Sequence, residues 1–238
     1  MRNTYFQFKQ FKINQEKSSL KVCTDSCLLG ALLAKKIEEK EICPNSILDI
    51  GAGTGLLSLM LAQKTDALID AVEIDDYSFE EMNSNFSQSP WHEQLQAFNA
   101  DIKSFKSEKK YDFIISNPPF FENSLKSQHA QKNIAKHQDG LTLEELLGCI
   151  KSLLNESGIF ALLLPFHRAE YFKSIAQEQG YFLKEEFQIK QTPAHSYFRS
   201  ILLFSIEKMD TKFQSLMIKN ENEVYNPIFK NLLEDYYL

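Results

Sequence analysis

The pattern of apolar and polar positions divides most of the chain into short, mainly apolar runs and longer segments with helical spacing. Such short runs are typical of buried strands, and apolar residues spaced three or four apart are typical of amphipathic helices. The predicted strands are residues 46–50, 68–73, 95–99, 111–116 and 159–164. The predicted helices are residues 25–39, 56–64, a segment that runs through Asn85, and 143–155. This alternation predicts a doubly wound, mostly parallel α/β sheet of the Rossmann-like type.

The C-terminal third breaks the alternation. A predicted helix over residues 167–179 is followed by two extended runs, 181–191 and 198–207, which we expect to pair antiparallel and to complete a seven-stranded sheet. No linker rich in glycine, serine or proline divides the sequence, so we expect a single domain over residues 1–238. It has an N-terminal arm of about residues 1–21 and a C-terminal tail of about residues 208–238, with a last helix at residues 227–236.

Composition narrows the class of protein. With 43% hydrophobic and 24% charged residues, the chain can bury a full core, which excludes wholesale disorder. The longest apolar runs are far shorter than the roughly 20 residues of a membrane-spanning helix, and the N-terminus lacks a basic-then-apolar leader. We therefore expect a cytoplasmic protein that does not bind a membrane. The four cysteines form no CxxC pair and no histidine lies at zinc-finger spacing, so we expect neither a metal site nor a disulfide framework.

The charge is unevenly distributed along the chain. The net charge of −6 argues against non-specific coating of nucleic acid, yet residues 1–21 carry five basic residues against one acidic residue. Aromatic residues are interleaved with these charges between Tyr5 and Phe11. Two interpretations stay open. In one, Arg2, Lys9 and Lys12 contact RNA while the aromatic rings stack on bases. In the other, the segment is an edge strand or an arm whose alternating aromatic rings dock on the domain.

A glycine-rich turn follows the strand at residues 46–50. In an open α/β sheet, backbone N–H groups at this position meet a bound ligand. A pyrophosphate-binding loop would have glycine where this chain has Leu56. A turn that merely needs positive φ angles would explain one or two glycines but hardly three at alternate positions. The D-x-G-x-G-x-G pattern instead resembles the first motif of S-adenosylmethionine-dependent methyltransferases, which implies that Asp49, Gly51, Gly53 and Gly55 bind the cofactor.

Acidic residues stand at the ends of the next two predicted strands. Glu73 ends the strand at 68–73, where a carboxylate can accept hydrogen bonds from both ribose hydroxyls of an adenosine cofactor, NAD included. By resemblance to the methyltransferases, Asp101 accepts a hydrogen bond from the adenine amino group and Ile102 packs on the ring. The alternative for Asp101 is a helix N-cap or a surface carboxylate.

The motif Asn117-Pro118-Pro119-Phe120 closes the strand at 111–116 and indicates the chemistry. An exocyclic or amide nitrogen is a poor nucleophile because its lone pair is delocalised. If the Asn117 side-chain oxygen and the Pro118 carbonyl each accept one N–H, the nitrogen is drawn toward tetrahedral geometry. Pro118 and Pro119 stiffen the loop, and preorganised acceptors contribute on the order of 3 kcal/mol each. Phe120 offers a face on which an unpaired base can stack.

These motifs, in this order, resemble the N-methyltransferases that act on planar amino or amide groups. A narrower resemblance rests on further segments, which are residues 8–11, 20–25, 28–31, 55–63, 85–91 and 114–120. Together they are similar to the bacterial valine-tRNA adenine N6-methyltransferase family over roughly residues 5–204. One departure is Cys23, where the family usually has glycine. The resemblance implies S-adenosylmethionine as cofactor, S-adenosylhomocysteine as product, and methylation of the adenine just 3' of the anticodon in a tRNA anticodon stem-loop.

The same resemblance assigns further residues. Lys21, Thr24 and Asp25 would line the entrance of the cofactor pocket, although as bare sequence they fit a surface lysine and an N-cap pair equally well. RNA contacts are expected from a basic segment and from the last strand of the sheet. The candidate residues there are Lys126, Lys132, Lys136, His137 and Arg199. The alternatives are a solvated polar loop for residues 121–137 and an ion pair with an acidic neighbour for Arg199.

Rival functions are weaker. Methylation of guanine N2 in ribosomal RNA, or of glutamine N5 in release factors, would normally require an extra domain for which the chain has no room. A nicotinamide oxidoreductase is opposed by Leu56 and gives no role to the motif at residues 117–120. A non-catalytic RNA-binding adaptor would be free to lose motifs that are intact in this chain. No sequence feature indicates an obligate protein partner.

Overall fold

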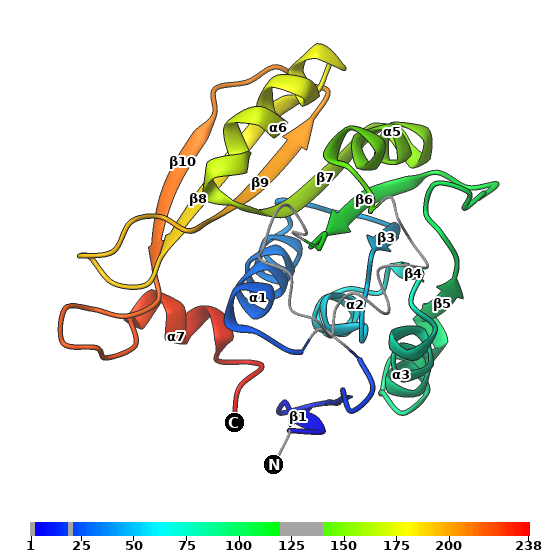
Figure 1. The fold of residues 1–238 in the computed structure, drawn as a ribbon, viewed down its shortest axis with the longest axis horizontal. Helices are drawn as coiled ribbons and strands as arrows, with labels where there is room; N and C mark the ends of the chain where they lie inside the picture. Colours follow the sequence, from blue (N-terminus) through cyan, green and yellow to red (C-terminus); the bar gives the residue numbers. More distant parts are fainter. Residues whose placement is uncertain (1–2, 19–20, 120–139) are drawn as a thin grey trace.

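The computed structural model describes residues 3–18, 21–119 and 140–238. In these residues one eight-stranded sheet has the strand order β10-β8-β9-β7-β6-β3-β4-β5, and a separate hairpin joins β1 to β2 (Figure 1). The strands are β1 Tyr5–Gln7, β2 Lys12–Asn14, β3 Ser46–Ile50, β4 Leu68–Glu73, β5 Leu95–Asn99, β6 Tyr111–Ser116, β7 Leu154–Pro165, β8 Phe182–Lys190, β9 Arg199–Ser205 and β10 Lys212–Met217. The helices are α1 Thr24–Glu38, α2 Leu56–Ala62, α3 Asp76–Ser87, α5 Leu143–Leu153, α6 Phe166–Glu178 and α7 Pro227–Leu233, with a 3-10 turn at His92–Gln94.

The predicted doubly wound sheet is confirmed. Strands β3, β4, β5 and β6 have the bounds predicted from their apolar runs, and these strands and β7 pair in parallel. Strands β8 and β9 form the expected antiparallel pair, and β9 also pairs antiparallel with β7. The central strands are predictable because both of their faces are buried, so nearly every position must be apolar.

Two parts of the sheet differ from the predictions. Strand β7 begins at Leu154, five positions before the expected start, because the chain leaves helix α5 and pairs Leu154 with Tyr111 before the register shifts. The sheet also gains an eighth strand, β10, which lies in the predicted tail and pairs in parallel with β8. Four of the six residues of β10 are exposed and Phe213 is 64% exposed. An edge strand with so little apolar burial leaves no clear alternation in the sequence.

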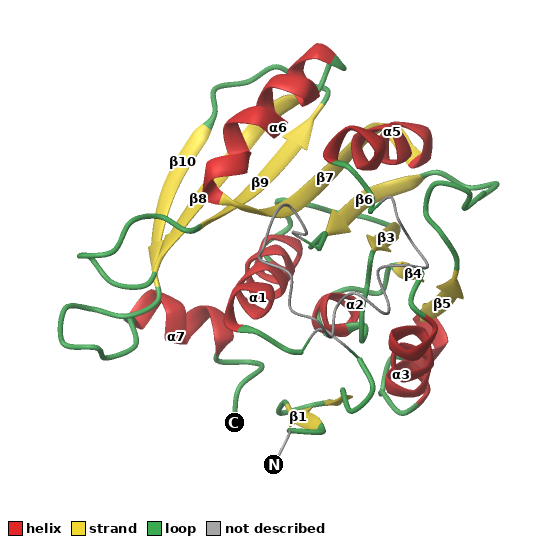
Figure 2. Cartoon of the chain, in the orientation of Figure 1, coloured by secondary structure: helices red, strands yellow, loops and turns green. Residues whose placement is uncertain are grey.

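Helices cover both faces of the sheet, as Figure 2 shows. Side chains from α1, α2, α3 and α7 pack in one apolar cluster with alternate residues of the strands, such as Ile47 and Phe113. Side chains from α5 and α6 pack in a second cluster with the intervening residues, such as Leu48 and Ile114. Within the described parts of the chain, none of these helices combines the length and the apolar character that crossing a bilayer requires.

The phenylalanines of the N-terminal arm dock on the domain, whereas Tyr5 is 50% exposed. Phe8 and Phe11 are buried, and their rings stack with centroids 4.5 Å apart. The rings of Phe11 and Trp91 pack edge to face with their centroids 6.0 Å apart. The centroids of the Phe8 and Tyr237 rings are 6.1 Å apart, and Tyr237 is near the C-terminus. The backbone N–H of Lys9 also donates to the Tyr236 carbonyl at 2.9 Å. For these rings the docking interpretation holds, and the arm lies beside the C-terminal end of the chain.

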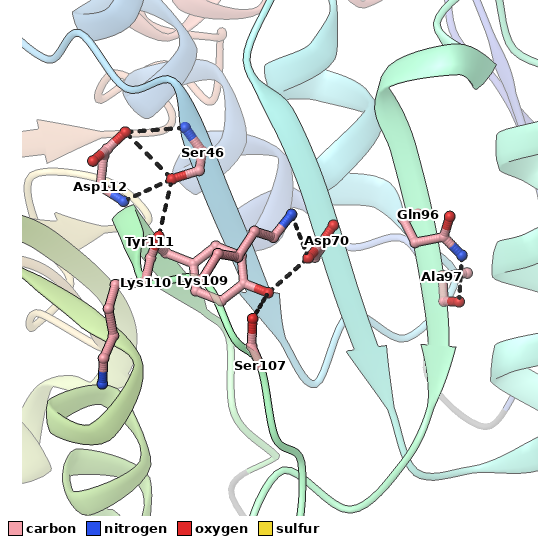
Figure 3. A network of polar contacts seen from close by, with 9 residues as sticks. All are labelled: Ser46, Asp70, Gln96, Ala97, Ser107, Lys109, Lys110, Tyr111 and Asp112. Atoms are coloured by element: carbon pink, nitrogen blue, oxygen red, sulfur yellow. Dashed lines mark hydrogen bonds and ion pairs between the residues drawn. The ribbon is translucent and has the colours of Figure 1, made fainter.

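A polar network fastens β3, β4 and β6 near their amino ends (Figure 3). The buried Tyr111 hydroxyl donates to Asp70 Oδ2 at 2.6 Å, and the Lys109 ammonium lies 2.8 Å from the same oxygen. Burial and the neighbouring Asp70 carboxylate raise the pKa of Tyr111, which keeps its hydroxyl a donor. Asp112 Oδ2 in turn accepts from the backbone N–H of Ser46 at 3.1 Å. These contacts set the relative positions of the three strands.

We expect Tyr111→Phe to lower the free energy of unfolding by about 1 to 2 kcal/mol, because it removes a buried hydrogen bond to the Asp70 carboxylate, whose remaining partner among the described residues is Lys109. Urea denaturation measures the change. Tyr77→Phe is the matched control, since Tyr77 is 58% exposed and surface substitutions of this kind stay within about 0.5 kcal/mol. Equal midpoints for the two variants would show that the network does not stabilise the sheet.

Candidate active site at the carboxyl ends of the central strands

The predicted motifs meet at one edge of the sheet. Strand β3 lies between β4 and β6, with Ile50 opposite both Val72 and Ser116. Because the three strands are parallel and end at the same level, the segments that follow them come together (Figure 1). These segments contain the glycine turn, the end of β4 at Glu73, and the Asn117-Pro118-Pro119 turn. This is the edge at which open α/β sheets bind their ligands.

The glycine turn combines left-handed backbone with open space. Gly51, Gly53 and Gly55 have φ angles of 70°, 58° and 83°. A Cβ atom added to Gly51 or Gly53 would meet no protein atom within 4 Å, whereas at Gly55 it would lie 2.4 Å from the ring of Phe86. Gly55 is therefore required for close packing of the turn on α3. The other two glycines leave open space beside the backbone, with Gly51 exposed and Gly53 half-buried, and we call this space the cradle.

Glu73 supports this turn from the end of β4. It is 8% exposed, and its Oε2 accepts from the Gly53 N–H at 2.8 Å while its Oε1 accepts from the Asp75 N–H at 2.8 Å. Burial raises the pKa of the Glu73 carboxyl, and the two backbone donors oppose that rise. Each carboxylate oxygen can accept a second hydrogen bond. The residue predicted to bind a ribose thus also fixes the loop.

Asp49 is fully buried beside the turn. Its Oδ2 accepts from the Ser58 hydroxyl at 2.7 Å, and its Oδ1 has no hydrogen-bond partner among the residues that the structure describes. Burial raises the pKa of the Asp49 carboxyl to about 7, against the weaker opposing effect of Ser58. A buried carboxylate with an unpartnered oxygen is costly, and groups of this kind concentrate at functional sites.

Asn117 has a fixed amide nitrogen at the end of β6. Its Nδ2 donates to the Ser26 hydroxyl at 2.8 Å, and no described residue donates to its Oδ1. The preceding residue, Ser116, donates its hydroxyl to the Ile50 carbonyl at 2.8 Å, which ties the end of β6 to β3. Pro118 is buried and Pro119 is exposed. The amide oxygen is therefore the available acceptor of this side chain.

Asp101 and Ile102 follow β5 at the edge of the site. Asp101 Oδ1 accepts from the Lys103 N–H at 2.9 Å, which is a bond within a turn, and because no helix follows β5 here the alternative of a helix N-cap is wrong. Ile102 is buried in the apolar cluster shared with α5 and α6. Their proposed contacts with an adenine ring stay predictions.

The residues before and at the start of α1 have partners of their own. The Lys21 ammonium donates to the backbone carbonyls of Gln15 and Glu16. The N-cap of α1 is Cys23, with no side-chain capping bond, so the alternative of an N-cap pair at Thr24 and Asp25 is wrong. Both lie in the first turn of the helix.

Arg199 begins β9 and pairs with the start of α1. Its Nε donates to Asp25 Oδ2 at 2.8 Å, which is the ion pair with an acidic neighbour that was one of its two alternatives. Contact with RNA stays a prediction for Arg199, as for Lys9 and Lys12. Six candidate residues lie outside the described parts of the chain, namely Arg2, Phe120, Lys126, Lys132, Lys136 and His137.

Sequence reasoning missed the role of Asn85. This side chain is 2% exposed, and its Nδ2 donates to the Thr54 carbonyl at 2.9 Å and to the Asn14 carbonyl at 3.1 Å. Its Oδ1 accepts from the Asn14 N–H at 2.9 Å. One amide thus joins the N-terminal arm to the glycine turn.

Glu81, one helical turn before Asn85 on α3, extends the same contact. Its two oxygens accept from the backbone N–H groups of Lys17 and Ser18 at 2.7 and 2.9 Å. The available signal was the presence of two polar residues four apart, beside the apolar Met82 and Phe86, on a helix that packs on the sheet.

Comparisons with known proteins agree with this geometry. The model of the family described as "Methyltransferase small domain" matches residues 28–145. A tRNA1(Val) (adenine(37)-N6)-methyltransferase of Flavobacterium psychrophilum is 38% identical over 236 residues, which are 98% of this chain and 99% of the relative. One of Dyadobacter fermentans is 39% identical over 244 residues, covering 100% of this chain and 98% of the relative. The chain belongs to the tRNA1(Val) (adenine(37)-N6)-methyltransferase family. The family expected from the motifs is confirmed, and the chain is a methyltransferase.

Solved structures support the fold. A predicted O-methyltransferase from Agrobacterium tumefaciens superposes with a TM-score of 0.66 at 15% identity, covering 89% of this chain and 96% of that chain. The P. horikoshii TYW2 structure in complex with MeSAdo superposes with a TM-score of 0.60 at 20% identity, covering 85% of this chain and 71% of that chain. The sheet and its helices are therefore those of a methyltransferase fold.

We expect Asp49→Asn to stabilise the fold at pH 8 and to lose part of this advantage at lower pH. The pKa of the Asp49 carboxyl is raised from 3.8 to about 7, so between these values the folded chain binds more protons than the unfolded chain. The free energy of unfolding therefore falls as the pH rises through this window, and the loss is complete above about pH 7. The amide of Asp49→Asn does not titrate. We expect the free energy of unfolding of this variant to exceed that of the unsubstituted chain by about 1 to 3 kcal/mol at pH 8.

Urea denaturation of the ligand-free protein at pH 5 and pH 8 measures this difference. A gap between the two chains that is the same at both pH values would show that the Asp49 carboxyl does not titrate in this range.

Proposed function

We propose that the chain transfers a methyl group from S-adenosylmethionine to N6 of adenine 37 in tRNA1(Val), the reaction for which its relatives are named. The observation that carries the proposal is the position of Asn117. Its amide nitrogen is held by Ser26 and its oxygen lacks a donor among the described residues, next to the glycine turn at the carboxyl edge of the sheet. An acceptor in this place suits a substrate with a planar amino group.

The residues present fit the proposed cofactor. The open cradle at Gly51 and Gly53 allows a ligand to approach the backbone closely, because a Cβ atom would occupy this space. The carboxylate of Glu73 keeps acceptor capacity for ribose hydroxyls, and Asp101 has a second carboxylate oxygen for the adenine amino group. The Asp49 carboxylate is buried beside the turn, so it favours a positively charged part of the cofactor through its charge rather than by direct contact.

The chemistry then follows from the chain's own acceptors. S-adenosylmethionine supplies the methyl carbon. The Asn117 Oδ1 and the Pro118 carbonyl each accept one N–H of the adenine amino group, which reduces delocalisation of its lone pair into the ring. Pro118 and Pro119 restrict the backbone of the turn, so the acceptors do not need to reorganise. We assign base stacking to Phe120.

The substrate RNA also needs contacts outside the pocket. We assign these to basic residues at the N-terminal arm, at residues 126–137 and at the start of β9. They are Arg2, Lys9, Lys12, Lys126, Lys132, Lys136, His137 and Arg199. We further propose that Lys21, Thr24 and Asp25 border the cofactor pocket. Guanine N2 and glutamine N5 methylation are not favoured, because relatives named for adenine N6 align over the whole chain.

The decisive experiment incubates the protein with S-adenosylmethionine labelled in the methyl group and with unmodified total tRNA. Nucleoside digestion and mass spectrometry should identify N6-methyladenosine in the valine tRNA. N2-methylguanosine, or label found only in protein, would overturn the proposal.

Asn117→Ala should lower kcat about 10² to 10³-fold, because it removes one preorganised acceptor, while the Kd of the cofactor changes less than about twofold. Asn155→Ala is the matched control, since the Asn155 amide bonds Asp112 at the opposite edge of the sheet and its loss should leave turnover intact. Undiminished turnover in Asn117→Ala would contradict the proposed acceptor.

Gly53→Ala and Gly180→Ala form a pair that separates ligand binding from backbone strain. Both glycines have positive φ, 58° and 86°, and neither would bring a Cβ within 4 Å of another atom. Each substitution should destabilise the fold by about 1 to 2 kcal/mol. Only Gly53→Ala should weaken binding of S-adenosylhomocysteine, by tenfold or more in titration calorimetry, because its methyl group enters the cradle. Equal Kd values for the two variants would place the ligand elsewhere.

A further inference from the structure

Ser26 connects helix α1 to the substrate-binding amide. It lies in the first turn of α1, where it is 8% exposed, and its hydroxyl oxygen is 2.8 Å from Asn117 Nδ2. On its other side the same oxygen lies 3.0 Å from Cys23 Sγ. Ser26 was absent from the residues expected to form the site, because a serine inside a helix gives no signal in the sequence.

The direction of these bonds fixes which end of the amide faces outward. A rotation of the Asn117 amide by 180° would exchange its oxygen and nitrogen with almost no change in shape. The exchange would replace the hydrogen-bond acceptor that faces the substrate with a donor. An outward NH2 group repels the N–H of an incoming amino group. In the structure, Ser26 Oγ accepts from Asn117 Nδ2. Its other neighbour is Cys23 Sγ, and either atom of that pair can be the donor.

The helix that carries Ser26 is rigidly placed. The residues that follow it, Cys27, Leu28 and Leu29, are each at most 1% exposed and belong to the apolar cluster shared with α2. The Ser26 hydroxyl therefore has a fixed position relative to the sheet, and the end of β6 is itself tied to β3 through Ser116. A fixed acceptor and a fixed strand end leave the amide one favoured orientation.

We propose that Ser26 is a positioning residue, which keeps the Asn117 amide turned so that its oxygen faces the amino group of the substrate. The proposal rests on the function proposed above. Ser26 does not touch the reacting atoms, so its removal should act on the rate of methyl transfer and leave cofactor binding unchanged.

Ser26→Ala should lower kcat about tenfold to a hundredfold, with the Kd of S-adenosylhomocysteine and the KM for tRNA changed less than about twofold. Ser26→Thr, which keeps the hydroxyl, should recover most of the rate. Ser205→Ala is the matched control, because the Ser205 hydroxyl bonds a backbone carbonyl at 3.2 Å at the far end of β9. Its kcat should stay that of the unsubstituted chain.

A double-mutant cycle shows whether Ser26 acts through Asn117 and remains decisive if Ser26→Thr fails to fold. In the Asn117→Ala background, adding Ser26→Ala should change kcat less than about twofold, because no amide is left to orient. Losses that multiply would overturn the positioning role, and so would a Ser26→Ala enzyme as fast as the unsubstituted one. These outcomes are distinct from failure of the proposed function, in which the unsubstituted chain itself would not methylate tRNA.

Discussion

The parallel pairing of β3 with β4 on one side and β6 on the other is the constraint on which the rest of the structure depends. It sets Ile50 opposite Val72 and Ser116, so three loops leave the sheet at one level. The ends are then locked by backbone bonds from Gly51 and Ala52 to the Val72 carbonyl, at 2.9 and 3.1 Å. A slip of one residue in β3 would move its inward side chains to the opposite face, which would separate the buried Asp49 carboxyl from Ser58 and the turn from its supports.

The site concentrates unfavourable charge burial in one place. Two carboxyl groups, Asp49 and Glu73, are taken from water beside a turn with three left-handed residues, and burial raises the pKa of both. The burial of Glu73 is offset by backbone donors at Gly53 and Asp75, whereas the donors to Asp49 among the described residues come from Ser58. Apolar packing of the leucine-rich helices α1 and α2 on the same face of the sheet offsets the free-energy cost of burying these carboxyl groups. The unmet hydrogen-bonding capacity of Asp49 therefore does not stabilise the fold, and it fits the cofactor site that we propose there.

The sequence predicted the structure best where the burial of apolar side chains alone decides it. The central strands β3, β4 and β6 were predicted to the residue because both of their faces are largely buried, and the edge strand β5 was predicted equally well. The motif residues were expected together because parallel strands share a carboxyl edge. Strand β10 was not predictable, because its stability comes from backbone pairing with β8 rather than from an apolar pattern. The partners of Asn85, Glu81 and Ser26 also could not be predicted. Each bonds across a long sequence separation, and a polar side chain on a helix does not encode what it faces.

Two amide side chains near this edge differ in how many of their hydrogen-bonding groups are used within the fold. Asn85 uses both of its ends on backbone groups, accepting from the Asn14 N–H and donating to the Thr54 and Asn14 carbonyls. Its hydrogen bonds lie within the fold, and its role is to hold the arm on the glycine turn. Asn117 uses only its nitrogen, on Ser26. An amide that is anchored at its nitrogen, with no described donor to its oxygen, has a defined orientation and an open acceptor, which is what the proposed substrate contact requires.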